Sequence, residues 1–238
     1  MVRTPQLDIL PLQAEVCEGG EIELQGKSEV ADILVGGEAN RLRIGDIYCT
    51  DPTRGNRDTI VRAGAYRGSD LVAQGIVFFV DASGRHGWMI GLQPVVDAKW
   101  REGAQQGEVI NGIVNHTTTW TAVKDTMGYT NTRLIRAMGN AAEYPAAYAV
   151  DFANGWYLPA LGQLYYMMSH MAVINNSLSV VGAPTLPVSS GSVTDDRYYW
   201  WSSSVHSMAN AWRLSNGNLE LGIASKTFHY YITPVKTF

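Results

Sequence analysis

The histidines are the first residues to test for chemistry, because imidazole binds metal ions and transfers protons near neutral pH. They are scattered along the chain, and none lies in HExxH or HxH spacing: His86, His116, His170, His206 and His229. Metal-dependent hydrolysis needs ligands that converge on one ion, and this spacing gives no such convergence. The sequence therefore predicts no metal centre and no cofactor.

Three further patterns fall short of a known reaction. The segment Trp201-Ser202-Ser203-Ser204-Val205 lacks the glycine pair that a GxSxG nucleophile turn requires. The pairs Gly19-Gly20 and Gly36-Gly37 are not followed by the Lys-Ser/Thr of a phosphate loop. Asp195-Asp196 follows a Ser/Gly-rich segment, where adjacent acids are typical of solvated turns, although a calcium site there stays open. We expect a protein that is not an enzyme.

The carboxy-terminal tail has the composition of a binding surface. Its aromatic residues are interleaved with Ser, Asn and Gly: Tyr198, Tyr199, Trp200, Trp201, Trp212, Phe228, Tyr230 and Tyr231. Such mixtures favour recognition, because aromatic rings supply contact area at low entropy cost while small polar groups adapt their hydrogen bonds. A terminal sheet with an aromatic inner face explains the tryptophans at least as well. For residues 205–210 and 225–229 both interpretations stay open.

Overall composition narrows the class of protein. The 238 residues are 46% hydrophobic and 17% charged, which is typical of a globular chain of one large domain, alone or with a small appendage. A net charge of −4 gives no broad cationic surface for nucleic acid, and the apolar run Ile76 to Val80 is far too short to span a membrane. No signal peptide is visible at the amino terminus. Cys17 and Cys49 are either bridged, as an extracellular protein would allow, or reduced thiols.

The pattern of elements predicts an α+β fold. Short apolar runs between glycines predict strands within 17–50, a surface loop around one short strand within 51–70, and a hairpin across 75–93. Polar residues 98–131 predict a long loop. Helices are expected around 134–138, from Pro145, and from Pro159 to a stop at Asn175-Asn176. A hairpin around Asn216-Gly217 and one terminal strand near 230–235 complete the chain.

Linked motifs in the second half resemble a known family. The order is Gly155-Trp156-Tyr157-Leu158-Pro159-Ala160, then Tyr199 to Ser204, Ala211-Trp212, Asn216-Gly217 and the terminal Thr233 to Phe238. It is similar to the C-type-lectin-like domains of the Legionella collagen-like protein C-terminal type, as found in Bacteroidetes surface proteins. The resemblance covers about 145–238 and implies a C-type-lectin-like fold for 71–238, with a β-rich extension over 1–70.

The same tail resembles the variable proteins of diversity-generating retroelements, in which the lectin fold displays altered side chains as a ligand-binding surface. That resemblance implies a scaffold of Trp156, Pro159, Trp201, Ser203, Trp212, Gly217 and Pro234. It implies ligand-binding positions at Tyr199, His206, Ser207, Asn210, Ser215, Asn218, Ser225, Thr227, Phe228 and His229. The expected partner is a protein or glycan on a cell or virus surface, and the expected location is the cell surface, the extracellular space or a virion.

Departures from the family leave two alternatives beside this main prediction. The sugar-binding tripeptides of calcium-dependent lectins are absent, and no cysteine follows Cys49, so the catalytic cysteines of the related formylglycine-generating enzymes are missing. Gln163 replaces the glutamate of the family's helix-start motif. One alternative is an adhesin or pilus-tip subunit of fixed specificity; the less favoured one is an oxidase of the formylglycine-generating type.

Overall fold

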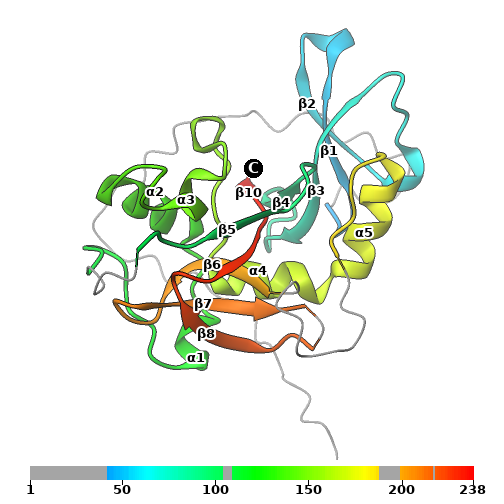
Figure 1. Ribbon diagram of the computed structural model, residues 1–238. Helices are drawn as coiled ribbons and strands as arrows, with labels where there is room; N and C mark the ends of the chain where they lie inside the picture. The colour runs from blue at the N-terminus through cyan, green and yellow to red at the C-terminus, as the bar shows by residue number, and fades with distance from the viewer. Residues whose placement is uncertain (1–41, 104–108, 188–198, 217) are drawn as a thin grey trace, which may run out of the picture.

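The computed structural model describes residues 42–103, 109–187, 199–216 and 218–238 (Figure 1). In these residues the strands form two sheets, and the helices lie in the middle of the chain. The prediction of an α+β fold class is therefore confirmed. Predictions that concern Cys17, the glycine pairs, Asp195-Asp196, Tyr198, Gly217 and most of the extension 1–70 lie outside the described residues.

The first sheet joins the early strands to the end of the chain. Its order is β10-β4-β3-β1-β2, and every pairing in it is antiparallel. The strands are β1 (Ile47–Asp51), β2 (Arg57–Val61), β3 (Val72–Val80), β4 (Gly87–Gly91) and β10 (Val235–Thr237). The predicted boundary at residue 70 therefore falls between two strands of one sheet, since β1 pairs with both β2 and β3.

The second sheet holds most of the carboxy-terminal tail. Its order is β5-β9-β6-β7-β8, with β6 and β9 parallel and the other pairs antiparallel. The strands are β5 (Val96–Lys99), β6 (Tyr199–Val205), β7 (Asn210–Ser215), β8 (Leu221–Ser225) and β9 (His229–Ile232). The hairpin predicted around Asn216-Gly217 is confirmed as β7 and β8, although Gly217 itself is not described.

Helices occupy the middle of the chain. They are α1 (Thr119–Ala122), α2 (Gly128–Met138), α3 (Pro145–Tyr148), α4 (Leu161–Ser169) and α5 (Met171–Val180), with 3-10 turns at Pro52–Arg54, Ala63–Ala65 and Phe152–Asn154. In Figure 1, α4 lies between the two sheets, and it contacts β3 on one side and β6 and β7 on the other.

One hydrophobic core contains residues of both sheets and of the helices between them. It contains Ile76 and Val235 from the first sheet, Leu161 from α4, and Trp200 and Trp212 from the second sheet. A second cluster covers the opposite face of the second sheet, where Trp201 and Tyr230 pack with Trp100 and with residues of α2 and α3. Because side chains alternate across a strand, Trp200 and Trp201 face different cores. The second sheet is thus covered on both faces over β6 and β7, whereas Ile223 of β8 and His229 of β9 reach solvent.

Three expectations about the elements were wrong in detail. The long helix ends at Ser169, and a separate helix α5 continues through Asn175. The Asn175 side chain does not stop that helix, because its amide bonds the backbone of Leu186 in both directions, at 3.0 and 2.8 Å. The terminal strand is two strands, β9 and β10, separated by Thr233-Pro234. The loop predicted over 98–131 also holds α1 and the start of α2.

Candidate binding surface

Two neighbouring turns bring together seven of the ten predicted ligand-binding residues. In the β6–β7 turn, the backbone N–H groups of His206 and Ser207 both donate to the Asn210 carbonyl, at 3.2 and 3.1 Å. In the β8–β9 turn, the hydroxyls of Ser225 and Thr227 are 2.9 Å apart. The side chains of these five residues are half-buried, which leaves them in contact with solvent while their turns stay ordered. We call the exposed atoms of residues 206–210 and 225–229 the tip surface.

Lys226 ties the two turns to each other. Its N–H donates to the Ala209 carbonyl at 3.0 Å, and its ammonium donates to the Met208 carbonyl at 2.9 Å. The ammonium also lies 4.6 Å from the centre of the Trp100 ring. Burial, aided by the nearby Arg101 cation, lowers the pKa of Lys226 to about 8. The tip surface is therefore organised around a buried positive charge.

Two more predicted positions, Phe228 and His229, belong to the β8–β9 turn, whereas Tyr199 and Asn218 lie elsewhere. Phe228 is 54% exposed and His229 is exposed beside Asp97, with His229 Nδ1 3.5 Å from the Asp97 carboxylate. Tyr199 is half-buried at the start of β6, with the Arg213 guanidinium 3.7 Å from its ring centre. Asn218 is exposed in the β7–β8 turn. Tyr199 and Asn218 thus lie away from the β6–β7 turn.

Ser215 does not belong to an exposed surface. It is only 8% exposed, because it pairs with Tyr199 inside the second sheet. A side chain buried to this extent cannot be presented to a ligand, so we correct its predicted display role.

The described scaffold residues lie in or next to the cores. Pro159, Trp201, Ser203 and Trp212 are buried. The Trp201 indole N–H donates to the carbonyls of both Ala98 and Phe228, at 3.1 and 3.3 Å. It therefore links the β8–β9 turn to β5. Trp156 and Pro234 are half-buried and both lie against Gly91, where an added Cβ would be 3.3 and 3.1 Å from them.

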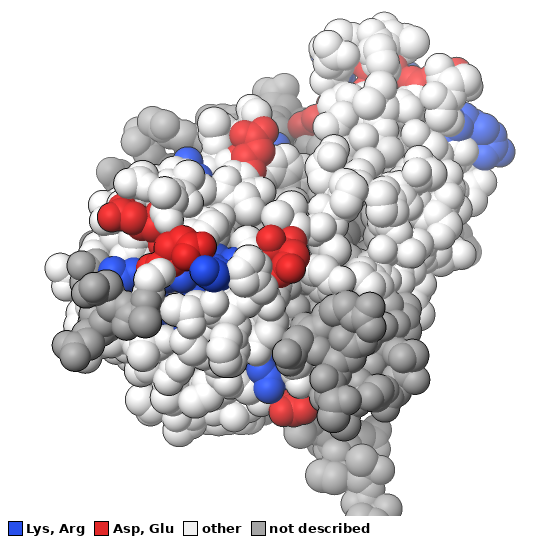
Figure 2. Space-filling view, viewed as in Figure 1, with Lys and Arg blue, Asp and Glu red and all other residues white. Residues whose placement is uncertain are grey.

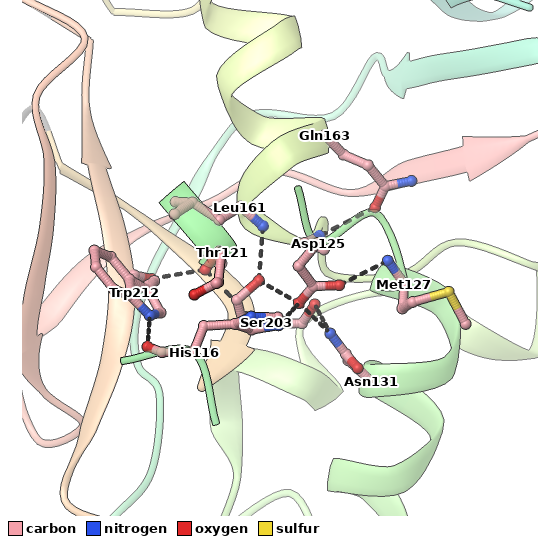
Figure 3. Close-up of polar contacts among 12 residues, drawn as sticks. His116, Thr121, Asp125, Met127, Asn131, Leu161, Gln163, Ser203 and Trp212 are labelled. Carbon is pink, nitrogen blue, oxygen red and sulfur yellow. Dashed lines mark hydrogen bonds and ion pairs between the residues drawn. The ribbon is translucent and has the colours of Figure 1, made fainter. Parts of the chain in front are cut away.

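A buried polar network fixes the base of this surface, and sequence reasoning missed its central residue. Figure 3 shows the Asp125 carboxylate surrounded by donors from several elements. It accepts from Ser204 Oγ at 2.6 Å, Asn131 Nδ2 at 3.0 Å and the Met127 N–H at 2.9 Å, and His116 Nε2 lies 3.5 Å away. Asp125 can be found in the sequence only as a turn-forming acid shortly before a helix.

The environment of Asp125 keeps its carboxyl ionised. Burial opposes the charge, but hydrogen bonds from His116, Ser204 and the Met127 N–H outweigh that effect and lower the pKa of Asp125. A nucleophilic triad needs the histidine between the serine and the acid, whereas here the Ser204 hydroxyl donates to the carboxylate itself. Ser204 is also completely buried, and its oxygen accepts from the Leu161 N–H at 2.8 Å. The geometry is that of a structural anchor.

The network reaches the surface through the backbone of residue 116. The His116 N–H donates to the Val205 carbonyl at 2.9 Å, and the His116 carbonyl accepts from the Trp212 indole at 2.8 Å. Asn115 forms an isolated parallel bridge with Val205. Residues 114–121, which we call the threonine loop, are therefore held directly beside the β6–β7 turn.

The helix that follows the Trp-Tyr-Leu-Pro motif keeps its cap despite the Gln163 replacement. Gln163 Oε1 accepts from the Ala160 N–H at 3.0 Å, and its amide donates to the Tyr157 hydroxyl at 2.9 Å. An amide oxygen three residues into a helix serves this purpose as a carboxylate does. The change of residue type therefore leaves the start of α4 intact.

Metal and membrane sites were searched within the same residues. No group of three His, Cys, Asp or Glu residues that could hold a metal ion occurs among those described. In the same part of the chain, no helix is long and apolar enough to cross a bilayer. Cys49 is buried and forms no disulfide there, and burial raises the pKa of its thiol to about 12.

Comparison with known proteins gives a likeness of fold. No protein-family model matches the sequence, and no curated protein does. Among solved structures, a fimbrial protein from Bacteroides ovatus superposes with a TM-score of 0.59 at 17% sequence identity. The superposition covers 83% of this chain and 49% of that protein, so the chain spans about half the length of its structural neighbour. The two proteins share a fold over that region.

Proposed function

We propose that this chain is a non-enzymatic adhesin or pilus subunit of the cell surface, with a ligand-binding surface built on the tip surface and the threonine loop. The single observation that carries the proposal is the fold shared with a fimbrial protein at a TM-score of 0.59. Its support is limited to fold, because an identity of 17% transfers neither ligand nor assembly.

The construction of the surface supports a binding role. Polar and aromatic side chains of two turns and one loop meet solvent, and their backbones are fixed by hydrogen bonds to buried residues. Binding sites are commonly placed on loops that a rigid scaffold positions. A C-type-lectin-like fold remains part of the proposal, supported by the order of the motifs and by the two-sheet α+β arrangement.

The retroelement interpretation is not supported by the structural neighbour, and the fixed-specificity adhesin agrees better with it. The two interpretations differ in whether the sequence of the gene varies between individuals. Sequencing the codons from Val205 to Tyr231 across the source population separates them. A uniform tail is expected for an adhesin; substitutions concentrated at the exposed positions, with Trp201 and Trp212 unchanged, would restore the retroelement interpretation.

Location and adhesion test the proposal directly. Intact source cells are treated with a protease, and the loss of an epitope-tagged chain is followed by immunoblotting. A deletion strain is then complemented with the natural gene or with a variant carrying Ser207→Ala, Asn210→Ala and Thr227→Ala, all at surface turns. We expect protease sensitivity, loss of adhesion on deletion, and rescue by the natural gene only. A protease-protected chain, or unchanged adhesion in the deletion strain, would refute the proposal.

A further inference from the structure

The threonine loop carries a large aromatic side chain at the surface. Trp120, the second residue of α1, is 63% exposed, whereas Trp100, Trp200, Trp201 and Trp212 are buried. An exposed indole offers a large flat apolar face with a polar N–H, and tryptophan is enriched in recognition surfaces for this reason. Val114, in the same loop, is 67% exposed.

The indole packs against a lysine side chain of the same segment. The Lys124 ammonium lies 4.1 Å from the centre of the Trp120 ring, which is cation–π geometry. The Thr118 hydroxyl accepts from the Thr121 N–H at 3.3 Å and caps the short helix that carries the ring. Since Lys124 covers one ring face, the exposure of the side chain leaves the opposite face to solvent.

Apart from Lys124 against one face, the exposed groups around the ring are uncharged. The exposed neighbours carry hydroxyl or amide groups: Asn115, Thr117, Thr118, Thr119 and Thr121. In Figure 2, the part of the surface over α1 and the adjoining end of β8 shows few charged side chains. Lys124 is occupied by the ring, and Asp125 is buried in the network below.

The loop is prepared for binding by the network of Figure 3. Its backbone is bonded to Val205 and to the Trp212 indole, and its His116 side chain lies against Asp125. A loop anchored in this way loses little conformational freedom when a ligand binds, so less of the contact energy is spent on ordering.

We propose that the threonine loop is a binding site for a neutral glycan, in which the open face of Trp120 stacks on the C–H face of a pyranose ring and the surrounding hydroxyl and amide groups bond its hydroxyls. A flat apolar face with a rim of neutral hydrogen-bonding groups matches a sugar ring, which has one apolar face and a polar edge. Residues 114–121 contain no Lys, Arg, Asp or Glu, and the neighbouring Lys124 lies against the other face of the ring, which fits an uncharged ligand better than an acidic one. This proposal names the ligand class of the proposed adhesin and rests on that function.

Affinity electrophoresis of the purified full chain tests it. Native gels contain one polysaccharide each: amylopectin, yeast mannan, xylan or β-1,4-galactan as neutral probes, and polygalacturonate as an acidic one. Four proteins are compared: the natural chain, Trp120→Phe, Trp120→Ala, and Val72→Ala as a control at a 50% exposed apolar residue of the first sheet. Thermal unfolding verifies that each variant is folded.

We expect at least one neutral polysaccharide to retard the natural chain and Val72→Ala equally. Trp120→Ala should weaken that affinity about tenfold or more, and Trp120→Phe should weaken it less because a flat ring remains. Retardation by none of the neutral probes, or equal retardation of Trp120→Ala, overturns the proposal. Binding to polygalacturonate alone overturns it as well.

The experiments distinguish a wrong assignment of the glycan site from a wrong assignment of the adhesin function. If Trp120→Ala complements the deletion strain and restores adhesion to a protein-coated surface, the adhesin stands and the threonine loop is not its glycan site. If the chain is protease-protected inside the cell, the adhesin fails, whereas glycan binding by the purified protein is still measured independently.

Discussion

Replacing Lys226 by methionine should make the protein more stable at neutral pH. Lys226 is 4% exposed, and its pKa falls from 10.5 to about 8 because burial penalises the ammonium and Arg101 repels it. At about 1.4 kcal/mol per pKa unit, keeping this lysine charged in the folded state costs about 3 kcal/mol. Methionine has a similar shape and no charge, but it loses the bond to the Met208 carbonyl, worth about 1 kcal/mol. We expect Lys226→Met to gain about 2 kcal/mol at pH 7.

The pH dependence of that gain is the sharper test. Between about pH 8 and pH 10.5 the unfolded chain binds more protons at Lys226 than the folded chain does, so the stability of the natural protein rises with pH over this window. Below it, both states are protonated and the whole penalty applies. The advantage of Lys226→Met should therefore shrink as pH rises and become a small disadvantage above about pH 10.

Urea unfolding followed by circular dichroism measures both quantities. Stabilities of the natural chain and Lys226→Met are compared at intervals from about pH 7 to pH 10, so that other titrating groups cancel in the difference. Val72→Ala serves as the control: Val72 is 50% exposed and neither side chain titrates, so its stability difference from the natural chain should not vary with pH. A Lys226→Met difference that is constant across the range would refute the reasoning, as would any loss of stability at pH 7.

Three further changes probe the anchor beneath the surface. Asp125→Asn should cost about 2–3 kcal/mol at neutral pH by urea unfolding. Because the folded pKa of Asp125 is lowered, its stabilisation is lost as pH falls below about 4, so the variant should lose less stability on acidification than the natural chain; parallel pH profiles would contradict this. Trp212→Phe removes the donor to the His116 carbonyl, and amide hydrogen exchange should speed up in the threonine loop; unchanged exchange there would count against the anchoring role. Gly162→Ala should destabilise by about 2 kcal/mol or more, since its Cβ would lie 2.4 Å from a backbone carbonyl, while Gly64→Ala, which meets nothing within 4 Å, should be neutral by the same unfolding assay.

The sequence carried enough information for the elements with strong local signals. Pro145 begins α3 as expected, because a proline in the first turn loses no helical hydrogen bond. The apolar run of β3 and the turn signal between β7 and β8 also identified strands correctly. Local signals failed where distant contacts decide the outcome. Asn175 continues a helix, and its amide is satisfied by the backbone of Leu186, 11 residues further along the chain.

The candidate surface was predictable in composition but not in arrangement. The tail was recognisable as a mixture of aromatic and small polar residues, and His206, Ser207, Asn210, Ser225 and Thr227 do meet in two adjoining turns. Ser215 differs from them only in burial. Both faces of β7 are covered, by the core with α4 on one side and by the second cluster on the other, and the sequence of one strand does not show what packs on its two faces.

Trp120 and Asp125 show why the rest of the site needed a structure. In the sequence, both lie in a polar stretch that predicts little more than a loop. Folding brings that stretch against β6, where Ser204 meets Asp125 and Val205 meets the backbone of residue 116. These contacts bury the carboxylate. The indole of Trp120, four or five residues from the anchored positions 115, 116 and 125, stays in solvent. On a loop without these bonds, an exposed tryptophan would pack against a nearby apolar surface. Here the Asp125 network holds the loop backbone and Lys124 lies against the ring, so the ring remains accessible to a partner.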